Sequence, residues 1–270
     1  MSNFDLIAKS YEKNAITQSK AAIRTLNYLR HYLKSTDCVL DIGSGSGQIT
    51  YEISKLTKGM VTGIDISKEM IAASKANYAA TNLAYVQQGA EALGETQKYN
   101  IIFSNSAFYY LKNRQLCYQK MHAALKPNGY LIAQIMYRDM FTPQLMQALE
   151  AIISEDNEIA SLISTFNNPI YLYSDKESFL LELTLAGFEH IESYEEEQVT
   201  TLDLHQAFSQ YESNFLVSLF NPCCYSDPER VSSSYIKKLR DKIKEKLALQ
   251  LDHNNQIHIT MPRMYVVVQK

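Results

Sequence analysis

The most constraining feature of this sequence is a short apolar run that ends in closely spaced glycines. Val39-Leu40-Asp41-Ile42 precedes Gly43-Ser44-Gly45-Ser46-Gly47, and Asp65 closes a second apolar run 22 residues after Gly43. The pattern predicts a buried strand, a tight turn, a helix and a second strand. Glycines let the backbone approach a ligand closely, and a carboxylate about 20 residues further along can accept both hydroxyls of a ribose. The sequence therefore predicts half of a nucleotide-binding α/β sheet.

The glycine spacing and the charge of Asp41 indicate which ribose-bearing ligand fits. The glycines follow a GxGxG spacing, and not the GxGxxG spacing that brings the backbone against a pyrophosphate. Asp41 stands two residues before the first glycine. Its carboxylate would repel a pyrophosphate and favour a ligand that carries an ammonium and a sulfonium. These features favour S-adenosylmethionine over a dinucleotide, the alternative being a glycine turn that only joins a strand to a helix.

The length and composition favour one globular domain with a sizeable insertion. The chain has 270 residues, of which 46% are hydrophobic and 20% are charged, as is typical of a folded protein with a large core. The formal net charge of −3 gives no general attraction to nucleic acid, so we expect no nucleic-acid partner.

Cysteine usage and the apolar runs indicate a cytoplasmic protein. The four cysteines have neither metal-ligand spacing nor the density of a disulfide scaffold, and they are Cys38, Cys117, Cys223 and Cys224. The N-terminal residues lack a basic region followed by an apolar stretch, and the longest apolar runs are too short to span a bilayer. We therefore expect reduced thiols, no metal centre and no membrane association.

Strand and helix signals alternate from residue 38 to residue 136, and the second half is more helical. The expected strands are 38–42, 60–65, 83–87, 99–104, 129–136, 188–196 and 260–269. The expected helices are 4–34, 47–56, 67–79, 112–124, 143–165, 175–186, 203–220 and 229–250. The alternation predicts a doubly wound, mostly parallel seven-stranded sheet with helices on both faces.

We expect a single domain over residues 1–270 with four functional parts. They are an N-terminal helical cover (1–36), a cofactor-binding core (37–136) and two helical insertions (137–174 and 200–257). In such folds ligands bind at the carboxyl edge of the sheet. The insertions are therefore predicted to fold over that edge as a substrate lid.

From about Phe4 to Met136 the chain resembles the class I S-adenosylmethionine-dependent methyltransferases. The glycine turn and Asp65 carry this resemblance. Phe4 to Gln18 looks like the N-terminal helix of the malonyl-carrier-protein methyltransferases, whereas Tyr171 to Phe188 is more similar to trans-aconitate and juvenile-hormone-acid methyltransferases. The resemblance implies a Rossmann-like fold and methyl transfer from S-adenosylmethionine. It points first to O-methylation of a small-molecule carboxylate, and second to a carrier-bound acyl group with an acyl carrier protein as partner.

The resemblance also implies roles for individual residues. The residues expected around the cofactor are Tyr11 and Gln18 from the cover, Asp41 near the ammonium, Gly43, Ser44 and Gly45 under the methionine, Asp65 on the ribose, Ile66 and Met70 beside the adenine, and Ala90 on the ring. Gly89 stands where the family has an aspartate, so Glu91 and Gln88 are the candidates to replace that acceptor. Asn105 and Ser106 would lie beside the methyl donor, and Tyr109 or Tyr110 would face the substrate.

Several residues have two interpretations. Arg138 would pair with a substrate carboxylate or face solvent, and the basic helix around 237–246 would be a solvated face or a dock for an acidic carrier protein. Cys223 and Cys224 are expected to be packing residues.

A carboxylate acceptor is ionised near pH 7 and needs no general base, whereas a hydroxyl acceptor would need one of the histidines, none of which stands in a recognisable motif. The remaining alternative is a catalytically silent cofactor-binding protein.

Overall fold

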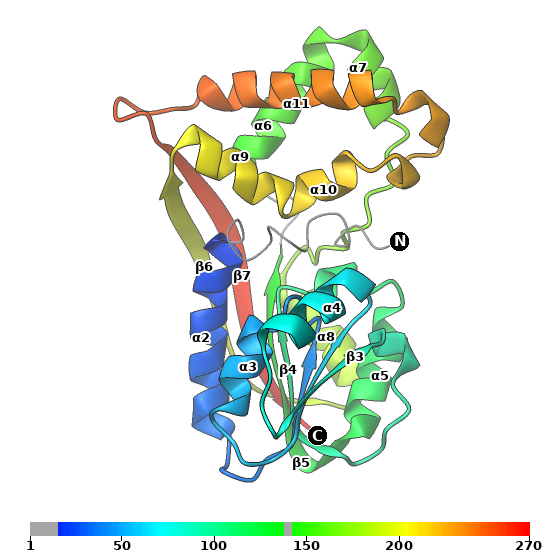
Figure 1. The fold of residues 1–270 in the computed structure, drawn as a ribbon, viewed down its shortest axis with the longest axis vertical. Helices are drawn as coiled ribbons and strands as arrows, with labels where there is room; N and C mark the ends of the chain where they lie inside the picture. The colour runs from blue at the N-terminus through cyan, green and yellow to red at the C-terminus, as the bar shows by residue number, and fades with distance from the viewer. Residues whose placement is uncertain (1–15, 138–141) are drawn as a thin grey trace.

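The computed structural model describes residues 16–137 and 142–270. They form a seven-stranded sheet with the strand order β3-β2-β1-β4-β5-β7-β6 (Figure 1). The strands are β1 (Val39–Ile42), β2 (Val61–Asp65), β3 (Leu83–Gln87), β4 (Tyr99–Asn105), β5 (Leu125–Met136), β6 (Glu189–Leu202) and β7 (Ile257–Gln269). β1 to β5 pair in parallel, and β7 runs antiparallel to β5 and β6. The mostly parallel, seven-stranded prediction is therefore confirmed.

Helices cover both faces of the sheet because successive side chains of a strand point to opposite faces. The flanking helices are α2 (Ile16–Tyr32), α3 (Gln48–Ser54), α4 (Lys68–Asn77), α5 (Arg114–Ala124) and α8 (Lys176–Leu185). In β4, Ile101 and Phe103 pack in one core cluster with Leu29 of α2 and Ile53 of α3. Ile102 packs in the other cluster, which holds the buried residues of α5 and α8. One strand thus supports both cores.

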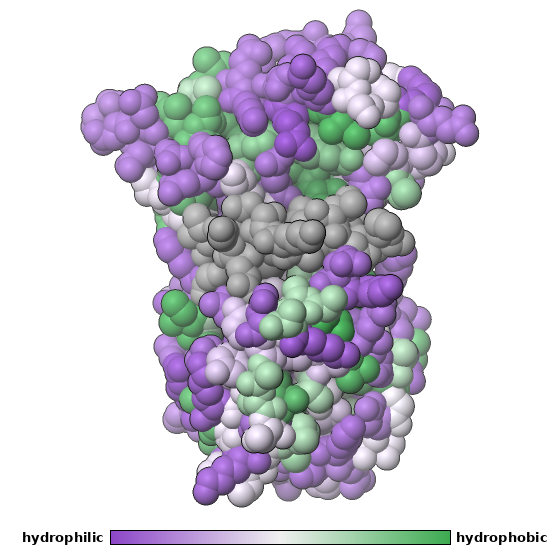
Figure 2. Space-filling view, viewed as in Figure 1, coloured by the Kyte–Doolittle hydropathy of each residue, from purple (hydrophilic) through white to green (hydrophobic). Residues whose placement is uncertain are grey.

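The remaining helices gather beyond the carboxyl edge of the sheet and are called the cap (Figure 1). They are α6 (Pro143–Glu155), α7 (Asn157–Ile163), α9 (Leu204–Glu212), α10 (Phe215–Leu219) and α11 (Ser233–Ala248). The long strands β6 and β7 run from the sheet to the cap, where they meet α9 and α11 (Figure 1). In the space-filling view, hydrophilic residues dominate the two ends of the cap and hydrophobic residues show between its helices (Figure 2).

The cap region departs from the predicted boundaries at three places. The single helix predicted over 143–165 is divided at Asp156, which has an extended backbone (φ −135°, ψ 101°) and whose carboxylate accepts a hydrogen bond from the N–H of Ile159. An aspartate that caps a new helix is favoured over one inside a continuous helix. β6 and β7 are longer than predicted, because their antiparallel pairing continues to the pair Leu202 and Ile257. The predicted helix 203–220 is also divided, at Asn214.

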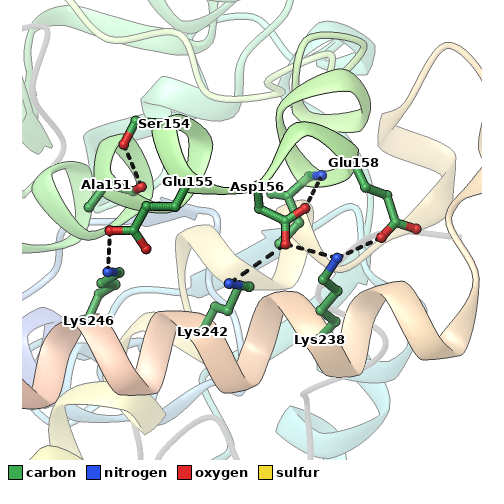
Figure 3. Close-up of polar contacts among 9 residues, drawn as sticks. Ala151, Ser154, Glu155, Asp156, Glu158, Lys238, Lys242 and Lys246 are labelled. Carbon is green, nitrogen blue, oxygen red and sulfur yellow. Dashed lines mark hydrogen bonds and ion pairs between the residues drawn. The ribbon is translucent and has the colours of Figure 1, made fainter.

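Lysines of α11 pair with carboxylates of α6 and α7 inside the cap (Figure 3). Lys238 Nζ lies 2.9 Å from Asp156 Oδ2 and 2.7 Å from Glu158 Oε2. Lys246 Nζ lies 2.6 Å from Glu155 Oε1, and Lys242 Nζ lies 3.7 Å from Asp156 Oδ2. This basic stretch therefore joins two layers of the cap and is not simply a solvated face. None of the helices within residues 16–137 and 142–270 is long and apolar enough to cross a membrane.

Candidate active site

A cavity of about 710 Å³ opens at the carboxyl edge of the sheet. Its floor is built from the residues that directly follow β1, β2, β3 and β4, because the ends of parallel strands meet at one edge. The predicted site residues on its wall are Gly43, Gly45, Asp65, Ile66, Met70, Ala90, Glu91, Asn105, Ser106 and Tyr110. In the described part of the chain, no cluster of three or more His, Cys, Asp or Glu residues could hold a metal ion.

Two glycines after β1 have left-handed backbone conformations, but the space for a side chain differs between them. Gly43 (φ 74°) and Gly45 (φ 53°) both have a positive φ, a backbone conformation that residues other than glycine rarely adopt. A Cβ on Gly43 would overlap the Cβ of Ala107, so this glycine is required by packing. A Cβ on Gly45 would meet no atom within 4 Å. The turn thus leaves open space over Gly45, on the wall of the cavity.

The carboxylate of Asp65 is held against the glycine turn. Its Oδ2 accepts a 3.0 Å hydrogen bond from the N–H of Gly45, and its Oδ1 accepts a 2.8 Å bond from the N–H of Ser67 at the start of α4. Each carboxylate oxygen has a second lone pair. The fixed carboxylate can therefore still accept hydrogen bonds from a ligand in the cavity.

Asp41 and Ser44 are buried and do not lie on the cavity wall. Asp41 is buried, and its Oδ2 accepts a 2.6 Å hydrogen bond from Thr50 Oγ1. Burial raises the pKa of Asp41 to about 7, against the opposing effect of the Thr50 hydrogen bond and with a smaller contribution from the charge of Asp65. The hydroxyl of Ser44 is buried without a hydrogen-bond partner among the described residues. An ammonium in the cavity would favour the ionised form of Asp41.

The segment after β3 brings a carboxylate close to Gly89, the position at which the resemblance predicts an aspartate. Gly89, Ala90 and Glu91 line the cavity, and a Cβ on Gly89 would lie 2.9 Å from Oε2 of Glu91. The side-chain amide of Gln88 instead donates to the carbonyl of Ala92 at 3.1 Å. Of the two predicted substitutes, the carboxylate of Glu91 therefore lies where a side chain on Gly89 would extend.

Of the two tyrosines predicted to face the substrate, only Tyr110 lines the cavity. Tyr109 is buried behind the wall, and its backbone carbonyl accepts a 2.7 Å hydrogen bond from the N–H of Tyr171. Burial raises the pKa of Tyr109 to about 12. Its phenol is therefore protonated at neutral pH.

Gln18 was predicted to project into the cofactor pocket and does not line it. Its side-chain oxygen accepts a 2.8 Å hydrogen bond from Nε2 of Gln210 in α9, and its backbone carbonyl accepts a 3.4 Å bond from Nδ2 of Asn105. Gln18 therefore connects a residue on the cavity wall to the cap. Tyr11, also predicted for the cofactor pocket, and Arg138, predicted to pair with a substrate carboxylate or face solvent, lie outside the described residues.

The far wall of the cavity comes mostly from loops within the predicted insertions 137–174 and 200–257. Its polar and aromatic members are Lys112, Asn167, Asn168, Tyr171, Asn221 and Cys223. Asn-Pro pairs mark loops in a sequence, but they do not say which loop reaches a cavity. The backbone N–H of Asn167 donates to the carbonyl of Cys224 at 2.7 Å, which holds these two loops together.

The prediction for the adjacent cysteines is wrong for Cys223. Cys224 is buried in the core as expected, and it also borders the cavity. Cys223 is exposed and lies on the cavity wall. The short helical turn Pro222–Cys224 directs the two neighbours differently, which the sequence pattern did not reveal.

Comparisons with known proteins agree with this architecture. A family model described as a methyltransferase domain matches residues 33–201. Among curated proteins, the malonyl-[acyl-carrier protein] O-methyltransferase of Bacillus cereus is 28% identical over 141 residues, which are 51% of this chain and 52% of that protein. The arsenite methyltransferase of Homo sapiens is 28% identical over 132 residues, which are 43% of this chain and 35% of that protein. The chain spans about half the length of the malonyl-carrier-protein relatives it matches.

A solved structure extends the likeness to nearly the whole chain. The BH2331 protein of Bacillus halodurans C-125 superposes with a TM-score of 0.61 at 16% identity, and the match covers 93% of this chain and 99% of that one. At this identity the likeness concerns the fold. The family model covers most of the sheet together with the cavity floor. The chain therefore belongs to the methyltransferase-domain family.

Proposed function

We propose that the protein transfers the methyl group of S-adenosylmethionine to the carboxylate of a small molecule. The observation that carries this proposal is that the carboxylates and the lysine on the cavity wall come from different segments of the chain. Two carboxylates lie on the wall, Asp65 at the end of β2 and Glu91 after β3. Lys112 and the amides of Asn168 and Asn221 come from segments after β4. A carboxylate acceptor beside them would meet donors and a positive charge, and the like charges lie on other segments.

The residues after β1, β2 and β3 fit a ligand with the shape and charge of S-adenosylmethionine. The open space over Gly45 admits a ligand against the turn, and the fixed carboxylate of Asp65 suits the hydroxyls of a ribose. Ile66 and Met70 supply apolar surface for a ring, next to Glu91 as an acceptor. S-adenosylmethionine supplies a methyl group already activated on a sulfonium.

The protein's part in such a transfer is alignment and exclusion of water. A carboxylate acceptor is already ionised near pH 7. The described residues on the cavity wall include no histidine, and burial holds the pKa of Tyr109 near 12, so neither supplies a base at neutral pH. These observations favour a carboxylate over a hydroxyl acceptor. We further propose that the cap, built from the two insertions of the single domain, acts as the substrate lid, and that the N-terminal segment is a separate cover.

A second candidate acceptor is an acyl group bound to a carrier protein. It is favoured by the B. cereus relative, whose name specifies a malonyl-carrier-protein substrate. The basic helix α11 supports this candidate less than its sequence suggested, because Lys238, Lys242 and Lys246 form ion pairs within the cap. The exposed Lys237 lies on the same helix and remains a candidate contact for an acidic partner.

A labelled-methyl assay separates these possibilities. The protein is incubated with methyl-labelled S-adenosylmethionine and, in parallel, with a panel of small carboxylic acids or with malonyl-carrier protein. Base-labile label on a free acid, absent with an Asp65→Ala variant, is the expected result. Label on the carrier-bound acyl group alone would establish the second candidate. Binding of S-adenosylhomocysteine without label on any acceptor would contradict both and indicate a silent cofactor-binding protein.

A further inference from the structure

Arg263 is a fully buried arginine in the middle of an apolar strand. It lies in β7 at 0% exposure, opposite Met136 of β5 and Glu196 of β6. Burying a guanidinium is costly unless its donors are satisfied. We propose that Arg263 is a positioning residue that holds the turn at Ser106, on the cavity wall, in place for the methyl transfer proposed above.

The guanidinium of Arg263 joins two elements that are distant in sequence. Its Nε donates to Oε1 of Gln198 in β6 at 2.9 Å, and its Nη1 donates to Oγ of Ser106 at 3.3 Å. Its Nη2 also lies 3.4 Å from the sulfur of Met261. A planar guanidinium presents these donors in fixed directions, which the single ammonium of a lysine cannot reproduce. Arginine is therefore suited to hold both partners together.

Ser106 needs such support because its backbone is left-handed. Its φ is 60°, one of the few positive values at a residue other than glycine among the described residues. Strained conformations of this kind persist where the surroundings overdetermine them. The N–H of Ser106 donates to the carbonyl of Gln134 at 2.9 Å, and its hydroxyl donates to Oε1 of Gln134 at 2.6 Å. The bond from Arg263 adds a further constraint to the same residue.

The turn at Ser106 joins the part of the cavity wall at the glycine turn to the segment that carries Lys112. Asn105, Ser106 and Ala107 all line it, and Ala107 packs directly against Gly43 of the glycine turn. Tyr110 follows on the wall, towards the segment that carries Lys112. An acceptor at that segment and a methyl donor at the glycine turn would meet beside Ser106. A displacement of about 1 Å in such a place can lower a rate by about 100-fold.

The same cluster includes Tyr109 behind the wall. The positive charge of Arg263 and a hydrogen bond with Ser106 both lower the pKa of Tyr109, although burial raises it more. Arg263, Ser106 and Tyr109 therefore lie close enough to act as one unit. Residues that act as a unit have non-additive effects when they are changed together.

Four variants test this role: Arg263→Gln, Arg263→Lys, Ser106→Ala and the double variant Arg263→Gln/Ser106→Ala. The control is Tyr265→Phe, which removes another buried hydrogen bond of β7, from the Tyr265 hydroxyl to Glu196, without touching Ser106. Turnover is measured with the acceptor that wild type methylates, and the affinity for S-adenosylhomocysteine by calorimetry. We expect Arg263→Gln to lower kcat by about 100-fold with little change in KM or cofactor affinity. Arg263→Lys should recover part of the loss, and Ser106→Ala should add little to it in the double variant.

Hydrogen exchange of the amides of residues 105–107 decides the question independently of the acceptor. Exchange should be faster in Arg263→Gln than in wild type and unchanged in Tyr265→Phe, with S-adenosylhomocysteine bound in each case. Unchanged exchange at these amides would overturn the role of Arg263. So would a loss of turnover no larger than in Tyr265→Phe, or losses that multiply in the double variant. If wild type methylates no acceptor, the proposed function fails, while the exchange measurement still decides whether Arg263 holds the turn.

Discussion

The side-chain oxygen of Gln18 accepts a 2.8 Å hydrogen bond from the side-chain amide of Gln210, 192 positions away. The bond joins α2, at the side of the sheet, to α9 in the cap. Gln18 also accepts from Asn105 through its backbone carbonyl, so the cavity wall, the covering helix and the cap are connected by two consecutive hydrogen bonds. Both glutamines are buried, at 6% and 0% exposure.

Replacing Gln210 should loosen the cap from the sheet. Gln210→Leu removes the donor to a buried amide oxygen, so we expect the free energy of unfolding to fall by about 1–2 kcal/mol. Urea denaturation measures the change. His205→Ala, at an exposed position of the same helix, should change stability by no more than about 0.5 kcal/mol. Equal effects of the two substitutions would mean that the glutamine pair contributes nothing specific.

The carboxylate of Asp65 should be needed for cofactor binding. Asp65→Ala removes a charged acceptor for the ribose hydroxyls and also the acceptor of the Gly45 and Ser67 N–H groups. We expect the binding of S-adenosylhomocysteine to weaken by about 1.5–3 kcal/mol in calorimetry. Glu52→Ala, an exposed carboxylate paired with Lys55, serves as the control and should bind normally. An unchanged affinity for Asp65→Ala would remove this residue from the site.

Substitutions at the two glycines of the turn should separate binding from folding. Gly45→Val places its side chain in open space, although the positive φ of this residue strains any side chain, so it should abolish cofactor binding while the circular dichroism spectrum stays close to that of wild type. Gly43→Ala overlaps Ala107 and should lower the midpoint of thermal unfolding as well. Retained cofactor binding by Gly45→Val would mean that the turn only joins β1 to α3.

Glu91 should replace the missing acceptor at position 89. Glu91→Ala should weaken the binding of S-adenosylhomocysteine by about 1–2 kcal/mol. The backbone of Gly89 (φ −84°, ψ 155°) accepts any residue, but a side chain there meets Glu91 Oε2. Gly89→Asp alone should therefore bind poorly, whereas Gly89→Asp combined with Glu91→Ala should recover the affinity. Poorer binding by the double variant than by Glu91→Ala alone would contradict this exchange of roles.

Asp41 should make stability fall as the pH rises. Burial raises its pKa to about 7 in the folded protein, whereas an unfolded aspartate titrates near 4. Between these values the folded state binds more protons, so the contribution of Asp41 to stability is present below about pH 4 and lost as the pH rises through about 7. The stability difference between Asp41→Asn and wild type should therefore grow in favour of the asparagine over this range. Urea denaturation across the range measures it, and a constant difference would exclude the raised pKa.

The sequence by itself determined the architecture of the cofactor-binding half. The strands at Val61 and Leu83, the turn at Gly43 and the carboxylate of Asp65 were predicted because each depends on residues close in sequence. An apolar run forms a buried strand, and a positive φ favours a glycine, whatever lies elsewhere in the chain. The ends of parallel strands then meet at one edge, which brings Gly45, Asp65 and Glu91 to the same cavity.

Only the tertiary structure decided which residues form the wall of the cavity opposite Gly45, Asp65 and Glu91. The far wall of the cavity, with Lys112 and Asn221, comes from loops whose place depends on how the cap packs. Lysines of α11 form ion pairs with carboxylates of α6 and α7, so a helix predicted to lie at the surface also connects two other helices of the cap. The buried Arg263 is 157 positions from the Ser106 hydroxyl that it contacts. Such contacts depend on packing between distant segments, and a pattern of neighbouring residues does not encode which distant partner a side chain will reach.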